Sequence, residues 1–165
     1  MAKRIEEFVG SLLRAHGLTL AVAESCTGGL AGHMITQIAG SSGYFMGGVI
    51  AYSNHAKIKL LGVKRTTLDR YGAVSSETAA EMARGAQKFF GADSALSTTG
   101  IAGPTGGSDA KPVGLVYIGL AVKGETITAR HVFGGTRHEI KTQAARAALT
   151  MLCKYVKKEY ELPHS

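Results

Sequence analysis

Residues 18–29 read LTLAVAESCTGG, and this stretch decides the fold. Its apolar first half, Leu18 to Ala23, predicts a short buried strand, and the apolar residues from Leu30 to Ile38 predict a helix directly after the turn. A serine in such a turn lies at the end of a sheet, beside the free backbone N–H groups of a helix start. Ser25 is therefore a candidate nucleophile or part of an anion site. The alternative is that Ser25 or Thr27 only caps the helix.

The rest of the chain alternates helical and strand-like segments. We expect helices from residue 5 to a stop at Gly17 and over residues 30–38, 55–61, 66–71, 75–90 and 136–160, and strands over residues 19–23, 45–52, 92–98, 113–122 and 126–133. The tight turn at residues 123–125 predicts that the last two strands pair antiparallel. The predicted fold class is α/β, a three-layer α/β/α sandwich with a mixed, mostly parallel sheet of about five strands.

Length and composition favour one compact domain over residues 1–165. Apolar residues make up 45% and charged residues 19%, which is not the composition of a disordered chain. Charges or glycines interrupt each apolar run, and the N-terminus turns acidic early, so we expect neither a membrane span nor a secretory signal. The two cysteines, Cys26 and Cys153, predict no disulfide framework and no metal-ligand pair, and they suggest the reducing cytoplasm.

The net charge of +7, from 19 basic and 12 acidic residues, favours anionic partners. The basic residues are scattered, and no interleaving of aromatic and basic residues predicts a platform for nucleic acids. An anionic small molecule explains the charge as well as DNA does. A solvated surface without a ligand explains it too.

Three polar segments follow predicted strands, at residues 24–29, 52–57 and 98–107. Ligands of open α/β sheets bind outside the C-terminal ends of the parallel strands, so we expect these segments to meet at one edge. Lys57 would then activate Ser25, provided that burial or the positive end of a helix keeps its amine neutral. Tyr52 would relay a proton or steady this pair. The alternative is an exposed Lys57 and a Tyr52 that packs on the sheet.

Residues 99–108 read TGIAGPTGGS, a loop with four glycines that can present backbone N–H groups to an anion. No Gly-Lys-Ser/Thr follows these glycines, so the loop does not match a phosphate-loop pattern, and a flexible crossover is the alternative. Arg137, in the first turn of the last predicted helix, could clamp a phosphate or carboxylate, or could be a surface residue. The six histidines show no spacing typical of a metal site.

Taken together, these segments resemble the CinA C-terminal domain family, whose stand-alone members are similar to nicotinamide mononucleotide deamidases. The resemblance runs from about residue 5 to residue 155, and several separate motifs in the same order make it specific. The matching motifs are residues 23–29 (AESCTGG), 38–42 (IAGSS), 51–54 (AYSN), Lys57, 71–75 (YGAVS), 99–104 (TGIAGP) with 106–107 (GG), and 111–114 (KPVG). The resemblance implies one stand-alone domain, without the N-terminal domain of larger CinA proteins.

The resemblance implies a metal-independent amidohydrolase, without a cofactor, that converts nicotinamide mononucleotide and water to nicotinate mononucleotide and ammonia in pyridine-nucleotide salvage. It implies Ser25 as nucleophile, Lys57 as its base and Tyr52 as an assisting hydroxyl. It also implies an anionic nucleotide as the partner and a homo-oligomer as the assembly. Contacts to the phosphate, the ribose and the oxyanion are assigned to Thr27, Gly28, Gly29, Asn54, Gly100, Gly103, Gly106, Gly107 and Arg137.

Two other functions stay open on the sequence alone. One is a non-catalytic pyridine-nucleotide-binding module linked to competence or DNA-damage responses, which acts through a partner. The other is an amidase for a different substrate. Release of many equivalents of ammonia per chain separates an enzyme from the module, and a panel of nucleotide and free amides separates the substrates.

Overall fold

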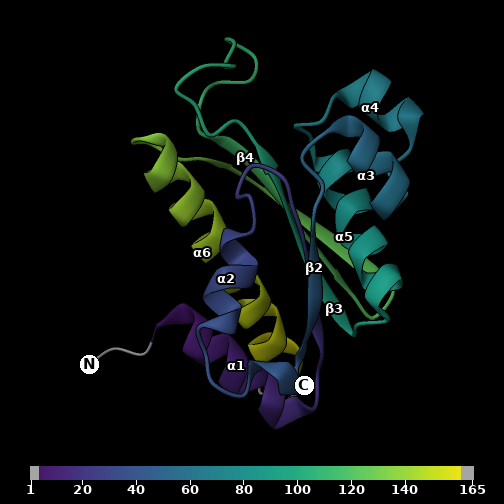
Figure 1. Ribbon diagram of the computed structural model, residues 1–165, viewed down its shortest axis with the longest axis vertical. Coiled ribbons are helices and arrows are strands. Elements are labelled where there is room, and N and C mark those ends of the chain that lie inside the picture. Colours follow the sequence, from purple (N-terminus) through teal and green to yellow (C-terminus); the bar gives the residue numbers. More distant parts are fainter. Residues whose placement is uncertain (1–3, 161–165) are drawn as a thin grey trace.

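The computed structural model describes residues 4–160 and shows one five-stranded sheet between two layers of helices (Figure 1). In chain order the elements are α1 (Ile5–His16), β1 (Leu20–Glu24), α2 (Leu30–Thr36), the 3-10 turn η1 (Ser41–Gly43), β2 (Phe45–Ile50), α3 (Asn54–Leu61), α4 (Arg65–Tyr71), α5 (Ser76–Phe90), β3 (Ser94–Gly100), β4 (Leu115–Val122), β5 (Glu125–Val132) and α6 (Arg137–Tyr160). The predicted α/β sandwich is confirmed.

The strand order in the sheet is β2-β1-β3-β4-β5. Strand β1 pairs in parallel with β2 and β3, whereas β4 pairs antiparallel with both β3 and β5. Only β4 therefore runs against the other strands, and the C-terminal ends of β1, β2, β3 and β5 lie at one edge. The predicted hairpin of the last two strands and the mixed sheet are confirmed. The loop after β3 projects at this edge, at the same end of the molecule as the start of α6 (Figure 1).

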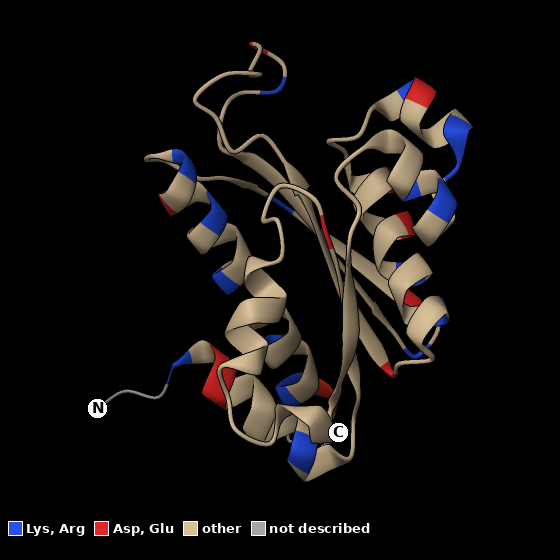
Figure 2. Cartoon of the chain, in the orientation of Figure 1, with Lys and Arg blue, Asp and Glu red and all other residues tan. Residues whose placement is uncertain are grey.

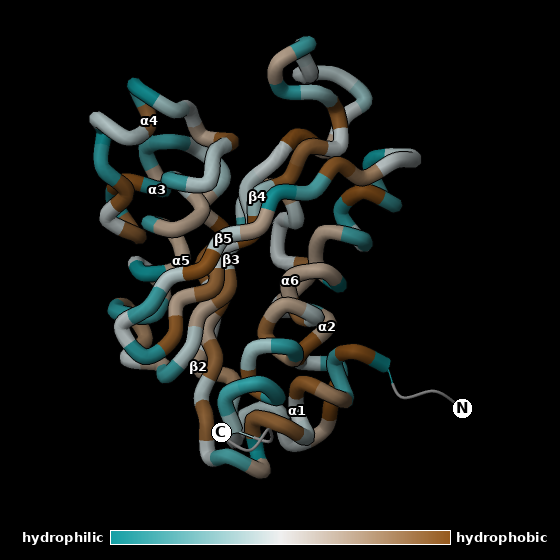
Figure 3. Tube along the Cα trace, turned by 180° about the vertical axis from the view of Figure 1, so that it is seen from behind, coloured by the Kyte–Doolittle hydropathy of each residue, from teal (hydrophilic) through white to brown (hydrophobic). Residues whose placement is uncertain are grey.

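Both faces of the sheet are covered, and alternate residues of β1 enter two separate clusters. Leu20 and Val22 pack in the cluster that also contains residues of α1 and α6, whereas Ala21 and Ala23 pack in the cluster with α3 and α5 residues. A strand that is buried on both faces carries a continuous apolar run instead of an alternating one. Hydrophobic residues accordingly follow the strands between the helical layers (Figure 3).

Helix α3, which carries Lys57, has well-defined ends. The Ser53 hydroxyl accepts a hydrogen bond of 3.1 Å from the backbone N–H of Ala56, and Gly62 ends the helix in the left-handed conformation with φ 67°. The last turn of α3 lies directly against α5. The two helices are so close at this point that a side chain at Gly85 would collide with the Leu61 carbonyl. These contacts fix the position of α3 beside the sheet.

The start of α6 is fixed by a capping box between Thr136 and Glu139. The backbone N–H of Thr136 donates to Glu139 Oε2 at 2.7 Å, and the backbone N–H of Glu139 donates to Thr136 Oγ1 at 3.3 Å. Hydrogen bonds from Thr136 lower the pKa of Glu139. Because the capping box sets where the helix begins, it also sets the place of Arg137 in the first turn.

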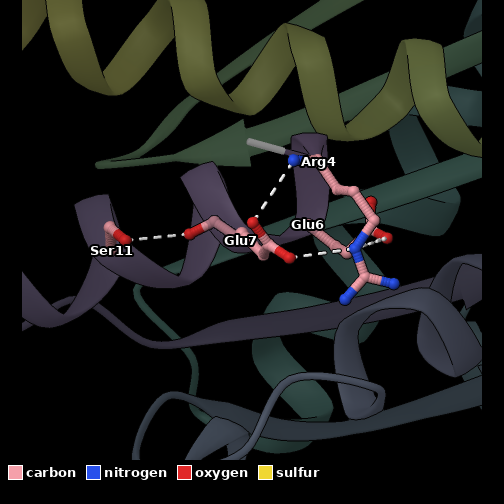
Figure 4. A network of polar contacts seen from close by, with 4 residues as sticks. All are labelled: Arg4, Glu6, Glu7 and Ser11. Atoms are coloured by element: carbon pink, nitrogen blue, oxygen red, sulfur yellow. Dashed lines mark hydrogen bonds and ion pairs between the residues drawn. The ribbon is translucent and has the colours of Figure 1, made fainter. Parts of the chain in front are cut away.

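The start of α1 lies toward the opposite end of the molecule, where exposed polar contacts surround Glu7 (Figure 4). The Glu7 carboxylate accepts from Arg4 Nε at 2.9 Å and from the Arg4 backbone N–H at 3.3 Å, and Ser11 Oγ donates to the Glu7 carbonyl at 2.9 Å. Exposed ion pairs of this kind add little to stability, because water and salt screen them.

Strand β3 begins at Ser94, two positions after the predicted start at Ala92. The Asp93 carboxylate accepts hydrogen bonds from the backbone N–H of Thr19 at 2.8 Å and from its hydroxyl at 2.7 Å. This side-chain contact holds the turns before β1 and β3 together, and the regular strand pairing begins after it.

Within residues 4–160, no helix is both long and apolar enough to cross a bilayer.

Candidate active site

Ser25 is the first residue after β1 and is held by its backbone on both sides. Its N–H donates to the Thr98 carbonyl at 3.0 Å, and its carbonyl accepts from the Gly28 N–H at 3.1 Å. The residue is 8% exposed. The end of the sheet therefore presents this hydroxyl in one defined place.

The side chain of Lys57 reaches Ser25 from α3. Side chains of a helix point back toward its N-terminus, so the amine lies beside the residues that precede α3. Lys57 Nζ lies 2.9 Å from Ser25 Oγ, 2.9 Å from the Ala51 carbonyl oxygen and 3.1 Å from the Tyr52 carbonyl oxygen. Lys57 is only 1% exposed, so the predicted alternative of an exposed lysine is wrong.

The surroundings of Lys57 favour its neutral form. Burial lowers the pKa of the Lys57 amine, and in the described part of the chain no carboxylate forms an ion pair with it. A neutral amine has two N–H donors and one lone pair. The two carbonyl oxygens take the two donors, which leaves the lone pair for the hydroxyl hydrogen of Ser25. This is the arrangement that a general base requires.

A cavity of about 260 Å³ opens at this pair. It is lined by seven of the predicted site residues: Ser25, Lys57, Tyr52, Gly100, Gly103, Gly106 and Arg137. Residues after β1, β2 and β3 thus meet at one edge of the sheet, as the sequence predicts, and Arg137, after β5, lies at the same edge. This convergence follows from the common direction of the four strands.

One wall of the cavity comes from a segment that the predicted residue set does not include. Ala73 and Val74, between α4 and α5, line the cavity together with the glycine-rich loop. Thr99 Oγ1 donates to the Ala73 carbonyl at 2.6 Å, and Lys111 Nζ donates to the Tyr71 carbonyl at 2.7 Å. The motif YGAVS at residues 71–75 is the sequence signal that could have identified this wall.

Arg137 joins two sides of the cavity. Its Nη1 donates to the Gly103 carbonyl at 2.8 Å, and its Nη2 donates to the Tyr52 hydroxyl at 3.1 Å. Tyr52 is 61% exposed. Within residues 4–160, no hydrogen bond joins the Tyr52 hydroxyl to Ser25 or Lys57, so Tyr52 meets Lys57 through its backbone carbonyl.

Five other predicted substrate contacts lie outside the lining of this cavity: Thr27, Gly28, Gly29, Asn54 and Gly107. The Thr27 hydroxyl is buried and donates to Glu24 Oε2 at 2.5 Å, and the Gly29 N–H donates to the same oxygen at 3.0 Å. Gly28, Asn54 and Gly107 are exposed. The polar groups at the start of α2 are therefore largely bound by Glu24, a residue that the predicted site lacks.

Cys26 also lines the cavity, next to Ser25 in the chain. Burial raises the pKa of the Cys26 thiol to about 11. Because the thiolate is the reactive form of cysteine, this thiol is a poor nucleophile at neutral pH. Among residues 4–160, no group of three or more His, Cys, Asp or Glu side chains is arranged to hold a metal ion.

The sequence model of the CinA C-terminal domain matches residues 2–156. The "CinA-like protein" of Kosmotoga olearia is 57% identical over 145 residues, which are 88% of this chain and 35% of that protein. The "putative competence-damage inducible protein" of Moorella thermoacetica is 50% identical over 95% of this chain and 38% of its own length. The chain thus spans little more than a third of the length of these relatives.

Solved structures agree with the sequence comparison. The competence/damage inducible protein CihA from Agrobacterium tumefaciens superposes with a TM-score of 0.87 at 41% identity, covering 93% of this chain and 98% of that one. The competence damage-inducible protein A from Klebsiella pneumoniae gives a TM-score of 0.90 at 33% identity, covering 96% and 99%. The sequence model and the solved structures agree, and this chain belongs to the CinA C-terminal domain family.

Proposed function

We propose that this chain is an amidohydrolase that converts nicotinamide mononucleotide and water to nicotinate mononucleotide and ammonia. The observation that carries the proposal is the contact of 2.9 Å between Ser25 Oγ and the buried Lys57 Nζ, at the wall of a cavity. A buried serine–amine pair without a charged partner supplies a nucleophile and its base. The names of the relatives describe competence and damage induction. The serine–amine site supports the hydrolysis, and the family resemblance of the sequence supports nicotinamide mononucleotide as the substrate.

The first half of the reaction acylates Ser25. The neutral amine of Lys57 takes the hydroxyl proton while Ser25 Oγ bonds to the carboxamide carbon, and the carbonyl oxygen becomes an oxyanion. The backbone N–H groups of the turn after Ser25 bind this oxyanion, and one such donor is worth about 10²–10³ in rate. The carbon–nitrogen bond then breaks, and the leaving nitrogen takes the proton from Lys57 and departs as ammonia.

The second half hydrolyses the acyl-enzyme. Lys57, neutral again, removes a proton from a water molecule that attacks the ester carbon. The ester bond to Ser25 breaks, and the proton on Lys57 returns to Ser25 Oγ. The product is nicotinate mononucleotide, and the positively charged pyridinium ring of the substrate makes its carbonyl carbon more electrophilic in both halves.

The phosphate of the substrate has its best-supported partner in Arg137. Two of the guanidinium N–H groups hold Gly103 and Tyr52, which leaves others for an anion. Gly103, Thr105 and Gly106 of the glycine-rich loop also line the cavity, and their backbone N–H groups are further candidate donors to the phosphate. The start of α2 is the weaker candidate, because the Glu24 carboxylate already binds its N–H groups.

The test is turnover by the purified chain with a metal chelator present. We expect release of many equivalents of ammonia from nicotinamide mononucleotide, and slower release from nicotinamide and from its unphosphorylated nucleoside. Saturable binding of nicotinamide mononucleotide without product would instead indicate a binding module. Faster turnover of another amide in the panel would identify a different amidase.

A further inference from the structure

Glu24, the last residue of β1, is a buried carboxylate with four hydrogen-bond donors. Its Oε2 accepts from the Thr27 hydroxyl at 2.5 Å, from the Gly29 N–H at 3.0 Å and from the Ala31 N–H at 3.1 Å. Its Oε1 accepts from the Gly32 N–H at 2.8 Å. The residue is 2% exposed. Glu24 precedes Ser25 in the chain and binds residues that follow it, so its side chain joins the two ends of the turn that carries Ser25.

The negative charge of Glu24 is compensated by the backbone. In the part of the chain that the structure describes, no Lys, Arg or His forms an ion pair with this carboxylate. Burial of a charge without compensation is strongly unfavourable. Three N–H groups at the start of α2 and one hydroxyl supply the compensation, because each donates a hydrogen bond to the carboxylate.

The charge of Glu24 also sets the direction of a short hydrogen-bond chain. An ionised carboxylate only accepts, so the Thr27 hydroxyl must donate to it. Thr27 Oγ1 also lies 2.7 Å from Thr98 Oγ1, and the Thr98 hydroxyl is consequently the donor there. Thr98 accepts the Ser25 N–H as well. The turn that carries Ser25 is thus tied to β3 through both a backbone and a side-chain contact.

The backbone N–H groups of this turn fall into two sets. Those of Ser25, Gly28 and Leu30 donate to backbone carbonyls, and those of Gly29, Ala31 and Gly32 donate to Glu24. The N–H groups of Cys26 and Thr27 donate to no other residue in the described range 4–160, and the Cys26 N–H contacts only its own thiol. Buried N–H groups normally find a partner. Two N–H groups that bind no other residue, directly after a nucleophile, are suited to an oxyanion.

We propose that Glu24 is a positioning residue: its carboxylate holds the turn so that the N–H groups of Cys26 and Thr27 face the oxyanion formed at Ser25. This inference rests on the proposed amidohydrolase function. Glu24 touches neither the substrate nor the reacting atoms in this account. It acts through the turn, and its effect falls on the transition state.

The decisive variant is Glu24→Gln, which keeps the shape of the side chain but replaces one accepting oxygen by an NH₂ donor. At least one of the four contacts is then lost. The matched control is Glu81→Gln, because the Glu81 carboxylate likewise accepts from a backbone N–H, that of Lys64, and from a threonine hydroxyl, that of Thr67. We expect kcat to fall by about tenfold to 10³-fold in Glu24→Gln and KM to change little, with Glu81→Gln close to wild type.

A second measurement separates positioning from a general structural role. The probe is the substrate analogue with an aldehyde in place of the carboxamide. Ser25 Oγ adds to its carbonyl carbon, the Ser25 proton passes to Lys57, and the hemiacetal oxygen becomes an oxyanion without a leaving group. In Glu24→Gln we expect the affinity for this aldehyde to fall by the same factor as kcat/KM, while the affinity for nicotinate mononucleotide stays within about threefold, because only the aldehyde forms an oxyanion.

Retention of wild-type kcat/KM in a folded Glu24→Gln protein would overturn the inference, and so would equal weakening of aldehyde and product. If that variant does not fold, Thr27→Val, which cuts the hydrogen-bond chain at its middle, gives the answer with the same two ligands and the same criteria. Absence of turnover in the wild-type protein would count against the proposed function. Turnover by wild type and an unaffected Glu24→Gln would count against the role of Glu24 alone.

Discussion

The hydroxyl oxygen of Ser25 and the amine nitrogen of Lys57 lie 2.9 Å apart, although 32 positions separate the two residues in the chain. The contact joins the turn after β1 to the helix after β2, and these strands are neighbours in the sheet. Both groups are buried, and the two backbone carbonyls beside Lys57 orient its amine. The fold therefore places a nucleophile and a base in contact before any substrate binds.

Replacement of Lys57 by methionine tests the base. Methionine fills a similar buried volume without an amine, and we expect kcat/KM to fall by about 10²–10⁴-fold.

In the wild type, kcat/KM should rise with pH as Lys57 loses its proton and level off above its pKa, which burial holds below the ordinary value of 10.5. The Lys57→Met profile should lack this rise. Lys59→Met, at an exposed site on the same helix, is the control, and a rise that persists in Lys57→Met would contradict the assignment.

The same lowered pKa predicts how stability depends on pH. The unfolded chain has a Lys57 pKa near 10.5, and the folded chain has a lower one, so between the two values the unfolded state binds more protons. The free energy of unfolding of the wild type should therefore rise with pH through this interval. Below the folded pKa, the folded state bears the full free-energy cost of burying a charged Lys57, and this cost falls as pH rises toward 10.5. Urea unfolding at a series of pH values should show that the stability advantage of Lys57→Met over wild type shrinks as pH approaches 10.5. A constant difference would contradict the direction of the shift.

Arg137→Met tests the phosphate contact. A charge-assisted hydrogen bond typically contributes about 1.5–3 kcal/mol, so we expect KM for nicotinamide mononucleotide to rise by about 10- to 100-fold. The kinetics with the unphosphorylated nucleoside should not change, because it lacks the anion. Arg146→Met, at an exposed position of α6, should leave both substrates unaffected. An equal loss with both substrates would place the phosphate elsewhere.

Tyr52→Phe distinguishes two roles of this tyrosine. Phenylalanine keeps the carbonyl that holds Lys57 but removes the hydroxyl that holds Arg137. We expect steady-state kinetics to show a higher KM and a kcat within about threefold of wild type. A proton relay through the hydroxyl, as the family resemblance implies, would instead lower kcat by about 10²-fold or more.

Much of the fold follows from patterns that act locally in the sequence. Gly17 and Gly62 end helices in the left-handed conformation, and Ser75 and Thr136 begin helices with side-chain caps. Alternation of helices and strands then fixes the common direction of β1, β2 and β3. The meeting of the strand ends was predictable from the sequence. The contact of Lys57 with Ser25 was not, because the spacing left an exposed Lys57 as the alternative and only the family resemblance favoured the pair.

The part that could not be predicted depends on which groups are already bound. Thr27 has the residue type and the position of a ligand contact, but its hydroxyl is taken by Glu24 and Thr98. Within residues 4–160, Glu24 forms no ion pair that would mark it, and its partners are the Thr27 hydroxyl and backbone N–H groups up to eight positions away. The strand boundaries near Thr19 and Asp93 shifted for a similar reason, because a side-chain contact between two turns decided them.

Ammonia release by the wild type and by Ser25→Ala tests the central claim most directly. Both proteins are incubated with nicotinamide mononucleotide and a chelator, and Ser11→Ala, at an exposed site on α1, controls for the substitution. The account predicts many equivalents of ammonia per chain from the wild type and from Ser11→Ala, and a loss of about 10³-fold or more in a folded Ser25→Ala protein, since removal of a nucleophile leaves only residual catalysis. Release by Ser25→Ala near the wild-type rate would contradict it.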